Sequence, residues 1–367
     1  MAALDRLRSG GVHCRGALAM ISLLTAFSTL SLVVQNPETD SMRALARDGP
    51  DSALVERVRQ RANDARKALR QLLAVGVAGD SVGAVALTAA ERLAGAFAVA
   101  WGDSFFVHQV ARFRSLAPAE RQVTVTADSI LRAGKAALRS AGIDAAMRAW
   151  RESLRRYDVL ADTSGIAAAF RALGAGFYYA QELDSAVAYL TRSQDLAQRI
   201  GDSLSVAMAV GNLGAVSEQR GELRRASELY ARAKSIDERM GDVISWAIDQ
   251  NNIGIVTAEL GDSAGARRAF EAALACDPDQ AEARYDLATL LYETGDIELA
   301  ASELRRVVQS APAFADAHYN LATALERLGS RRQAREHLER YLALVAEGAT
   351  VEQAPWIADA RARLGKL

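Results

Sequence analysis

The chain is poor in the residues on which disulfide-rich, metal-bound and β-rich folds depend. Of its 367 residues only two are cysteines, Cys14 and Cys276, and only four are histidines. Two cysteines cannot form a disulfide framework or a zinc site. Proline occurs six times, aromatic residues make up 6%, and long alternations of Val, Ile and Thr are absent. We therefore expect an all-α protein without a metal or a cofactor.

The charge balance also excludes some classes of partner. The net charge is −1, so the chain has no bulk attraction to nucleic acid or to an anionic membrane. It contains no glycine-rich phosphate loop and no basic stripe interleaved with aromatic residues.

The chain does contain a sequence pattern that is repeated six times between Ala127 and Gly348. The copies span residues 127–166, 167–206, 207–246, 247–280, 281–314 and 315–348. Counting from each start, position 20 is always Ala and position 8 is always Gly or Ala. Position 24 is always large, and its residues are Trp150, Leu190, Tyr230, Phe270, Leu304 and Leu338. Several columns that hold over six copies indicate a repeat array.

The spacing of these columns predicts a hairpin of two helices in each copy. Positions 7, 8 and 11 share one face of a first helix, and positions 20, 24 and 27 share one face of a second. Small residues at positions 8 and 20 allow close approach of the two backbones, and the large residue at position 24 fills the groove beyond. Turns such as Gly261-Asp262 and Gly295-Asp296 separate the helices, with Gly at the end of one and Asp or Ser as the cap of the next.

These residues resemble the tetratricopeptide repeat family. The three later copies have its 34-residue period, and Pro278 and Pro312 lie near the end of their second helix, as in that family. The earlier copies resemble its longer variant, in which Gly-Asp joins successive repeats, as at Gly201-Asp202 and Gly241-Asp242. The resemblance implies an α-solenoid of antiparallel helix pairs in a right-handed superhelix, used as a binding scaffold.

The regions outside the array suggest an exported chain with helical ends. Residues 17–34 carry no charge and follow three arginines, so residues 1–36 are interpreted as a signal peptide or membrane anchor. The basic flank places the rest outside the cytoplasm, periplasmic or anchored at an inner membrane; a buried helix in a cytoplasmic protein is the alternative. Residues 37–50 are expected to be a linker, residues 51–126 an N-terminal helical region that begins with one long helix from Asp51, and residues 349–367 a capping helix.

Three serines occur in strings that are typical of hydrolases. Gly79–Gly83 and Gly261–Gly265 fit G-x-S-x-G around Ser81 and Ser263, and Ser203 lies in a Gly-Asp-Ser-Leu string. A nucleophile elbow needs a strand before the serine and a helix after it. Ser263 and Ser203 lie at predicted helix junctions, so Ser81 is the only candidate, and no further strands are predicted around it. His318 and His337 lie in one hairpin and can approach each other, but a single pair makes a poor metal site.

The better functional signal is the inner face of the array. In the family that this chain resembles, positions 2, 5, 9, 12 and 13 of the first helix line a groove that holds peptides, and Asn at position 6 grips peptide backbone in some members. The groove candidates of the early copies are Lys135, Arg139, Arg171, Tyr178 and Asn212, and those of the later copies are Asn251, Asn252, Glu259, Tyr285, Tyr292, Glu293, Tyr319, Asn320 and Glu326. The alternative is that these residues form a solvated face with hydrogen bonds between repeats.

The sequence thus favours a non-catalytic scaffold that holds a partner polypeptide in the groove, through tyrosine anchors and matched charges. One alternative is a sensor or regulatory arm of a signalling assembly whose effector domain is on another chain. The other is a serine hydrolase that uses Ser81.

Overall fold

The computed structural model describes residues 37–345 and 354–366. These residues form eighteen α-helices and no strand, which confirms the all-α class. They belong to two compact units, residues 1–249 and 250–367, which are called unit 1 and unit 2 below. The segment 1–36, expected to be a signal peptide or anchor, lies outside the described residues.

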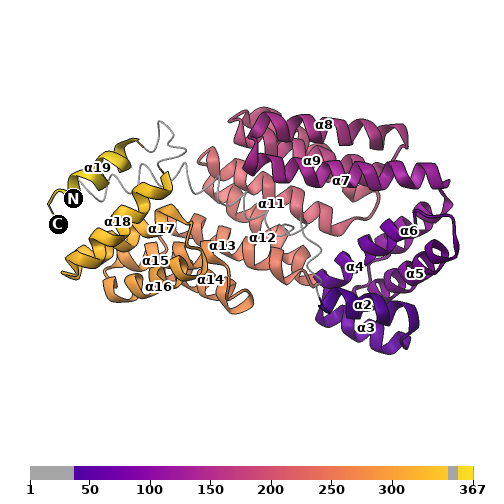
Figure 1. The fold of residues 1–367 in the computed structure, drawn as a ribbon, viewed down its shortest axis with the longest axis horizontal. Helices are drawn as coiled ribbons and strands as arrows, with labels where there is room; N and C mark the ends of the chain where they lie inside the picture. Colours follow the sequence, from indigo (N-terminus) through magenta and orange to yellow (C-terminus); the bar gives the residue numbers. More distant parts are fainter. Residues whose placement is uncertain (1–36, 346–353, 367) are drawn as a thin grey trace. The chain divides into compact units, whose positions relative to one another are not determined.

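Unit 1 begins with a bundle of five helices (Figure 1). They are α2 (Pro37–Asp48), α3 (Asp51–Gln60), α4 (Ala62–Val75), α5 (Ser81–Trp101) and α6 (Phe105–Ser115). Met42 and Ala46 of α2 are fully buried and join one apolar core with residues of the other four helices. The expectation of a linker over residues 37–50 is therefore wrong, because this polar segment has an apolar face that the bundle covers.

The expected long helix from Asp51 is also interrupted. Arg61 adopts φ −140° and ψ 49°, which separates α3 from α4. The break lets both helices turn an apolar face to the same core, with Leu54 and Val58 from α3 and Leu69 and Leu72 from α4.

Helix α5 is long and apolar enough to cross a membrane by length and composition, the only such helix among the described residues. Half of the most apolar 18-residue stretch of this helix is buried inside the structure. Leu93 and Phe97 lie in the bundle core, so α5 is the central helix of the bundle, and its apolar character follows from that position.

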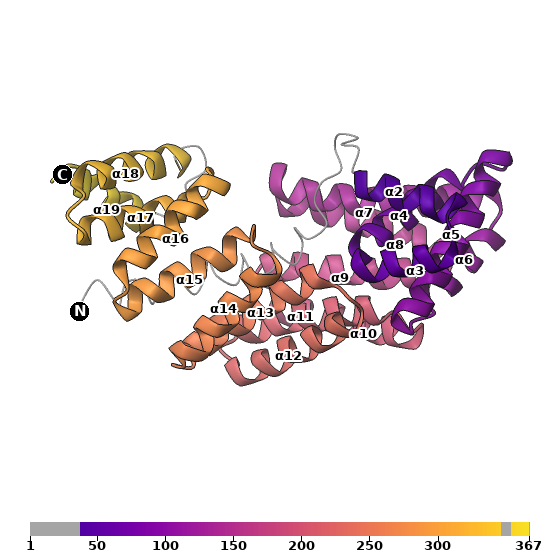
Figure 2. The same cartoon turned by 90° about the horizontal axis from the view of Figure 1, so that it is seen from below.

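Paired helices follow the bundle in unit 1, as Figure 2 shows from below. The pairs are α7 (Pro118–Ser140) with α8 (Ile143–Val159), α9 (Thr163–Tyr179) with α10 (Leu183–Arg199), and α11 (Ser203–Gln219) with α12 (Leu223–Arg239). Helix α7 runs unbroken through residue 126, so no break in the backbone separates the N-terminal region from the repeats. Helix α13 (Val243–Glu259) crosses the boundary of the two units.

Unit 2 continues with the same kind of pair and ends with a single helix. It contains α14 (Ser263–Cys276), α15 (Ala281–Thr294), α16 (Ile297–Ser310), α17 (Ala315–Arg327), α18 (Arg331–Val345) and α19 (Ala354–Leu364). Trp356, Ile357 and Leu364 of α19 pack against the apolar core of the last pair.

The small residue at position 8 makes room for the large residue at position 24 of the same hairpin. A Cβ atom on Gly134 would lie 2.5 Å from the indole nitrogen of Trp150. On Gly174 it would lie 2.7 Å from Leu190. The equivalent distance at Gly214 to Tyr230 is 2.8 Å. In these three pairs of helices the large side chain packs directly on the backbone at the glycine.

The turns between helices use glycine and aspartate as expected. Gly201, Gly221, Gly241, Gly261, Gly295 and Gly329 all have positive φ. The aspartate, and not the serine after it, caps the next helix: the carboxylate of Asp202 accepts the backbone N–H of Ser205 at 3.0 Å, and that of Asp262 accepts the N–H of Gly265 at 2.8 Å. In two earlier turns a non-glycine residue takes positive φ, with 47° at Ala161 and 62° at Gln181.

Candidate functional site

The groove candidates of the early repeats are less open than the sequence predicted. Lys135 and Arg171 are half-buried, and Arg139 lies in α7 with a side chain outside the described part. Tyr178 is 1% exposed and packs edge to face on Tyr179 at 5.6 Å. Burial lowers the pKa of Arg171, while the carboxylate of Asp202 acts in the opposite direction. The prediction that Tyr178 lines an open groove is therefore wrong.

The asparagines at positions 5 and 6 lie inside the stack. Asn212, Asn251 and Asn252 are all buried. The amide of Asn251 donates to a carboxylate oxygen of Asp286 on the next first helix at 3.0 Å. Buried in this way, the three amides are closed to peptide backbone, and Asn251 links neighbouring repeats instead.

Two tyrosines of α15 remain half-buried on one face of that helix. Tyr285 and Tyr292 are seven residues apart, which places them two helical turns apart on the same side. The Tyr285 ring lies 4.9 Å from that of Phe314, and its hydroxyl accepts the amide of Asn320 at 2.8 Å. The guanidinium of Arg327 lies 5.4 Å from the centre of the Tyr292 ring. Neighbouring side chains thus fix both rings and leave part of each in solvent.

Glu259 and Glu293 lie near the C-terminal ends of α13 and α15. Glu259 is half-buried and Glu293 is exposed. Helix α15 therefore carries one acidic and two aromatic groove candidates, all at least partly accessible.

The last two candidates are covered by the C-terminal helix. The hydroxyl of Tyr319 donates to Asp359 at 2.6 Å, and its ring packs edge to face on Trp356 at 5.5 Å. Arg363 lies over the same ring at 4.9 Å and donates to Glu326 at 3.1 Å. Helix α19 thus occupies the surface that Tyr319 and Glu326 were expected to offer to a partner.

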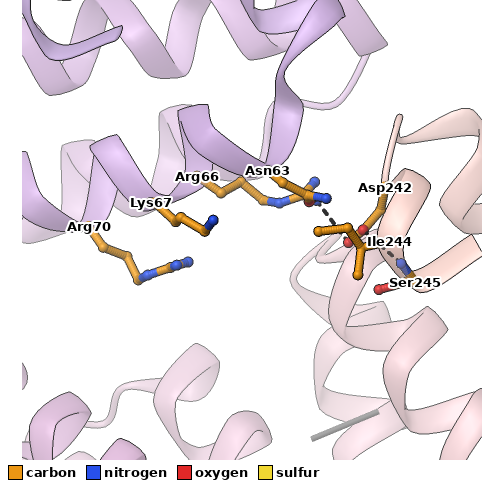
Figure 3. A pocket seen from close by; sticks show the side chains of 7 residues that line it. All are labelled: Asn63, Arg66, Lys67, Arg70, Asp242, Ile244 and Ser245. Carbon is orange, nitrogen blue, oxygen red and sulfur yellow. Dashed lines mark hydrogen bonds and ion pairs between the residues drawn. The ribbon is translucent and has the colours of Figure 1, made fainter. Parts of the chain in front are cut away.

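A further set of polar residues forms a pocket in unit 1 that the sequence analysis missed (Figure 3). It is lined by Asn63, Arg66, Lys67 and Arg70 of α4, and by Asp242, Ile244 and Ser245 at the start of α13. The signal was present, because the four α4 residues have the 3, 4 and 7 spacing of one helical face, opposite Ala65, Leu69 and Leu72.

The serine and histidine candidates show no catalytic or metal geometry. Ser81 is exposed and is the first residue of α5, behind the capping Asp80, with no strand before it. The nucleophile elbow is therefore absent at Ser81. His318 and His337 do meet, with their Nδ1 atoms 3.0 Å apart. Among the described residues no group of three potential ligands could hold a metal ion.

The stacked helix pairs and the partly accessible first-helix surface define a helical-repeat protein. Residues 252–313 and 285–349 match the family model of the tetratricopeptide repeat. Residues 252–349 therefore carry tetratricopeptide repeats. A comparison with curated protein sequences gives no match.

Several solved structures are similar to about half of this chain. TTC0263, a thermophilic tetratricopeptide repeat protein of Thermus thermophilus, is 21% identical with a TM-score of 0.43, over 54% of this chain and 98% of its own. YrrB, described as a tetratricopeptide repeat protein with an unusual peptide-binding site, is 19% identical with a TM-score of 0.35, over 55% and 95%. MamA of Desulfovibrio magneticus RS-1 is 17% identical with a TM-score of 0.39, over 50% and 97%.

Proposed function

We propose that the protein is a non-catalytic scaffold that binds a partner polypeptide on the α15 surface of unit 2. The observation that carries this proposal is the pair of half-buried tyrosines, Tyr285 and Tyr292, on one side of α15. Tyrosine offers a large contact area for little loss of side-chain entropy, and rings already fixed by neighbours lose less still on binding. Phe314 and Arg327 provide that fixation.

The charge beside the tyrosines favours a partner with apolar and basic side chains. Glu293 is exposed at the end of the same helix. A carboxylate at the rim of an aromatic surface mainly speeds encounter with a basic partner and makes binding sensitive to salt.

The test compares partners of the wild type and of a Tyr285→Ala/Tyr292→Ala variant. The full chain is cross-linked in native membranes, purified and analysed by mass spectrometry. Leu299→Ala is the matched control, because Leu299 is 51% exposed but lies on α16, the second helix of the same hairpin. We expect the variant to lose partners that the wild type and the control keep. An unchanged list of partners in the folded double variant would refute the α15 surface as the binding site.

We also propose that residues 1–36 direct the chain out of the cytoplasm, which the uncharged segment 17–34 behind three arginines supports. Cell fractionation, with the N-terminus of the mature chain determined by mass spectrometry, tests this. Recovery of the intact chain in the cytoplasm alone would contradict it.

A further inference from the structure

Helix α4 turns a polar face toward the repeats of unit 1. Its apolar face, with Ala65, Leu69 and Leu72, is buried in the core of the N-terminal bundle. The opposite side points Arg66, Lys67 and Arg70 into the pocket that begins at Asp242 of the α12–α13 turn (Figure 3). Of these three cations Arg66 is buried against other parts of the chain, whereas Lys67 and Arg70 remain accessible to solvent.

One terminal nitrogen of the Arg66 guanidinium lacks an acceptor, although the other bonds the side-chain oxygen of Asn63 and the carboxylate of Asp242. The side chain is only 5% exposed, and its Nη2 atom lies 2.8 Å from a carboxylate oxygen of Asp242. Its Nη1 atom is buried too, yet no described residue accepts a hydrogen bond from it. A buried guanidinium donor without an acceptor costs free energy, and a ligand oxygen in the pocket would remove that cost.

The charges that line the pocket favour an anion. Arg66, Lys67 and Arg70 are basic, and Asp242 is the one acid among the lining residues. Lys67 also has Asp64 nearby, at 3.4 Å. Cations gathered in one place repel each other, and a bound carboxylate would reduce the repulsion.

The pocket can be reached from solvent. Arg70 is exposed and Lys67 is half-buried, so a ligand can contact both before it reaches the deeper Arg66. The half-buried lysine and the exposed arginine at the entrance attract an acidic chain, and the buried arginine fixes the orientation of the contact.

We propose that this pocket is a second binding site, which takes the carboxylates of an acidic segment of a partner polypeptide. One carboxylate accepts from Nη1 of Arg66, and a neighbouring one lies between Lys67 and Arg70. Because the site lies wholly in unit 1, it is independent of the tyrosines of α15.

The probe is a fluorescein-labelled peptide of alternating glycine and paired glutamates, titrated with the full chain and followed by fluorescence anisotropy. Its counterpart carries glutamine at every glutamate. The test variant is Lys67→Gln/Arg70→Gln, which keeps the buried Arg66–Asp242 pair. The matched control is Arg192→Gln/Arg232→Gln, which removes the same charge from exposed positions of α10 and α12. Circular dichroism verifies the fold of each variant.

We expect the wild type and the control to bind the glutamate peptide, and the test variant to bind it about ten-fold or more weakly, with an affinity that falls as salt is added. The glutamine peptide should not bind. Equal binding of both peptides, unchanged affinity in the test variant, or no binding to the wild type would each overturn the proposal. Tighter binding of inorganic phosphate than of the glutamate peptide, measured by competition, would assign the pocket to a free anion and also overturn it. None of these outcomes depends on the partners lost by Tyr285→Ala/Tyr292→Ala.

Discussion

Arg66 and Asp242 form an ion pair at 2.8 Å with both side chains at least nine-tenths buried. Arg66 belongs to α4 of the N-terminal bundle, and Asp242 begins α13 and caps it by accepting the N–H of Ser245 at 3.1 Å. Trp101 and Phe106 pack against the apolar cluster around Leu204 and Met240 in the same region. The bundle is therefore fastened to the repeats of unit 1 by both charge and apolar contact.

Breaking this pair from one side should destabilise unit 1 strongly. Arg66→Met leaves the carboxylate of Asp242 buried without its cation, which costs about 3–5 kcal/mol. Arg66→Met/Asp242→Asn removes both charges while an amide oxygen remains to cap α13, so it should recover most of that loss. Urea unfolding followed by circular dichroism gives both values, and a double variant as unstable as the single one would contradict this account.

The buried carboxyl groups of Asp237 and Asp249 should make stability fall as pH rises. Both side chains are buried, and desolvation raises both pKa values well above the usual range. The positive charge of Lys234 acts against the rise for Asp249, and that of Arg66 acts against it for Asp237. Oδ1 of Asp237 and both carboxyl oxygens of Asp249 are buried without a hydrogen-bond partner, which disfavours the charged form of both groups. The folded state then holds a proton that the unfolded state releases above about pH 4, so stability declines from there through the folded pKa.

Asp249→Asn replaces that proton with a permanent amide donor. We expect it to raise the unfolding midpoint at pH 8 and to flatten the decline, which is at most roughly 1.4 kcal/mol per pH unit for one proton. Asp195→Asn, at an exposed position of α10, should do neither. Thermal melts between pH 4 and 9 provide the measurement, and an unaltered slope in Asp249→Asn would exclude Asp249 as the source of the decline.

The histidine pair of unit 2 should make stability fall as the pH drops, which is opposite to the effect of Asp237 and Asp249. Nε2 of His318 faces the carbonyl oxygen of Pro312 at 3.2 Å and must carry a proton. In a neutral ring its Nδ1 is then an acceptor, so Nδ1 of His337 donates to it. Burial lowers the pKa of both rings. The unfolded chain therefore binds protons more readily, and stability should fall as pH drops below about 6.5.

His337→Gln should weaken this acid sensitivity, whereas His108→Gln, at an exposed position of α6, should retain it. Urea midpoints at pH 7.5 and 5.5 test this prediction. Equal acid sensitivity in both variants would place its origin elsewhere.

The bare backbone at Gly214 should not tolerate even one methyl group. In Gly214→Ala the new Cβ would lie 2.8 Å from the Tyr230 ring, which is fully buried and donates to Glu218 at 2.8 Å. We expect a loss of about 1–3 kcal/mol from overpacking. Gly95→Ala is the control in α5, where a Cβ meets nothing within 4 Å, and it should stabilise the chain by roughly 0.5–1 kcal/mol. Loss of stability in both variants would show that the cost does not come from the contact with Tyr230.

Glycine should stabilise the two turns that lack it. Ala161 and Gln181 hold positive φ where later turns have glycine, a conformation that costs an L-residue about 1–2 kcal/mol. After the greater entropy of glycine in the unfolded chain is subtracted, Ala161→Gly and Gln181→Gly should each gain roughly 0.5–1 kcal/mol. Gly221→Ala, at φ 73°, should lose a similar amount. Thermal unfolding measures all three, and a loss of stability at Ala161 would show that its turn is held by other contacts.

The sequence alone determined the elements that depend on near neighbours. The spacing of small and large residues in each hairpin predicted the contact of Gly134 with Trp150, because both lie on helices joined by one short turn. Gly-Asp predicted the turn and the cap at Asp262 for the same reason. The match of 252–349 to the tetratricopeptide repeat rests on this local pattern.

Only the tertiary structure decided which surfaces stay open. Tyr319 and Tyr285 occupy the same repeat position, yet α19 covers the first and leaves the second half-buried. The polar sequence of α2 suggested a linker, and only the packing of Met42 in the bundle core shows that it is a helix of the bundle. Arg66 and Asp242 form an ion pair although they lie far apart in the chain. The local sequence around either residue does not predict its partner. The exposure of a side chain depends on which distant segment packs on it. A local pattern that repeats along the sequence therefore determines the helices, but it does not determine which of their residues stay accessible to a partner.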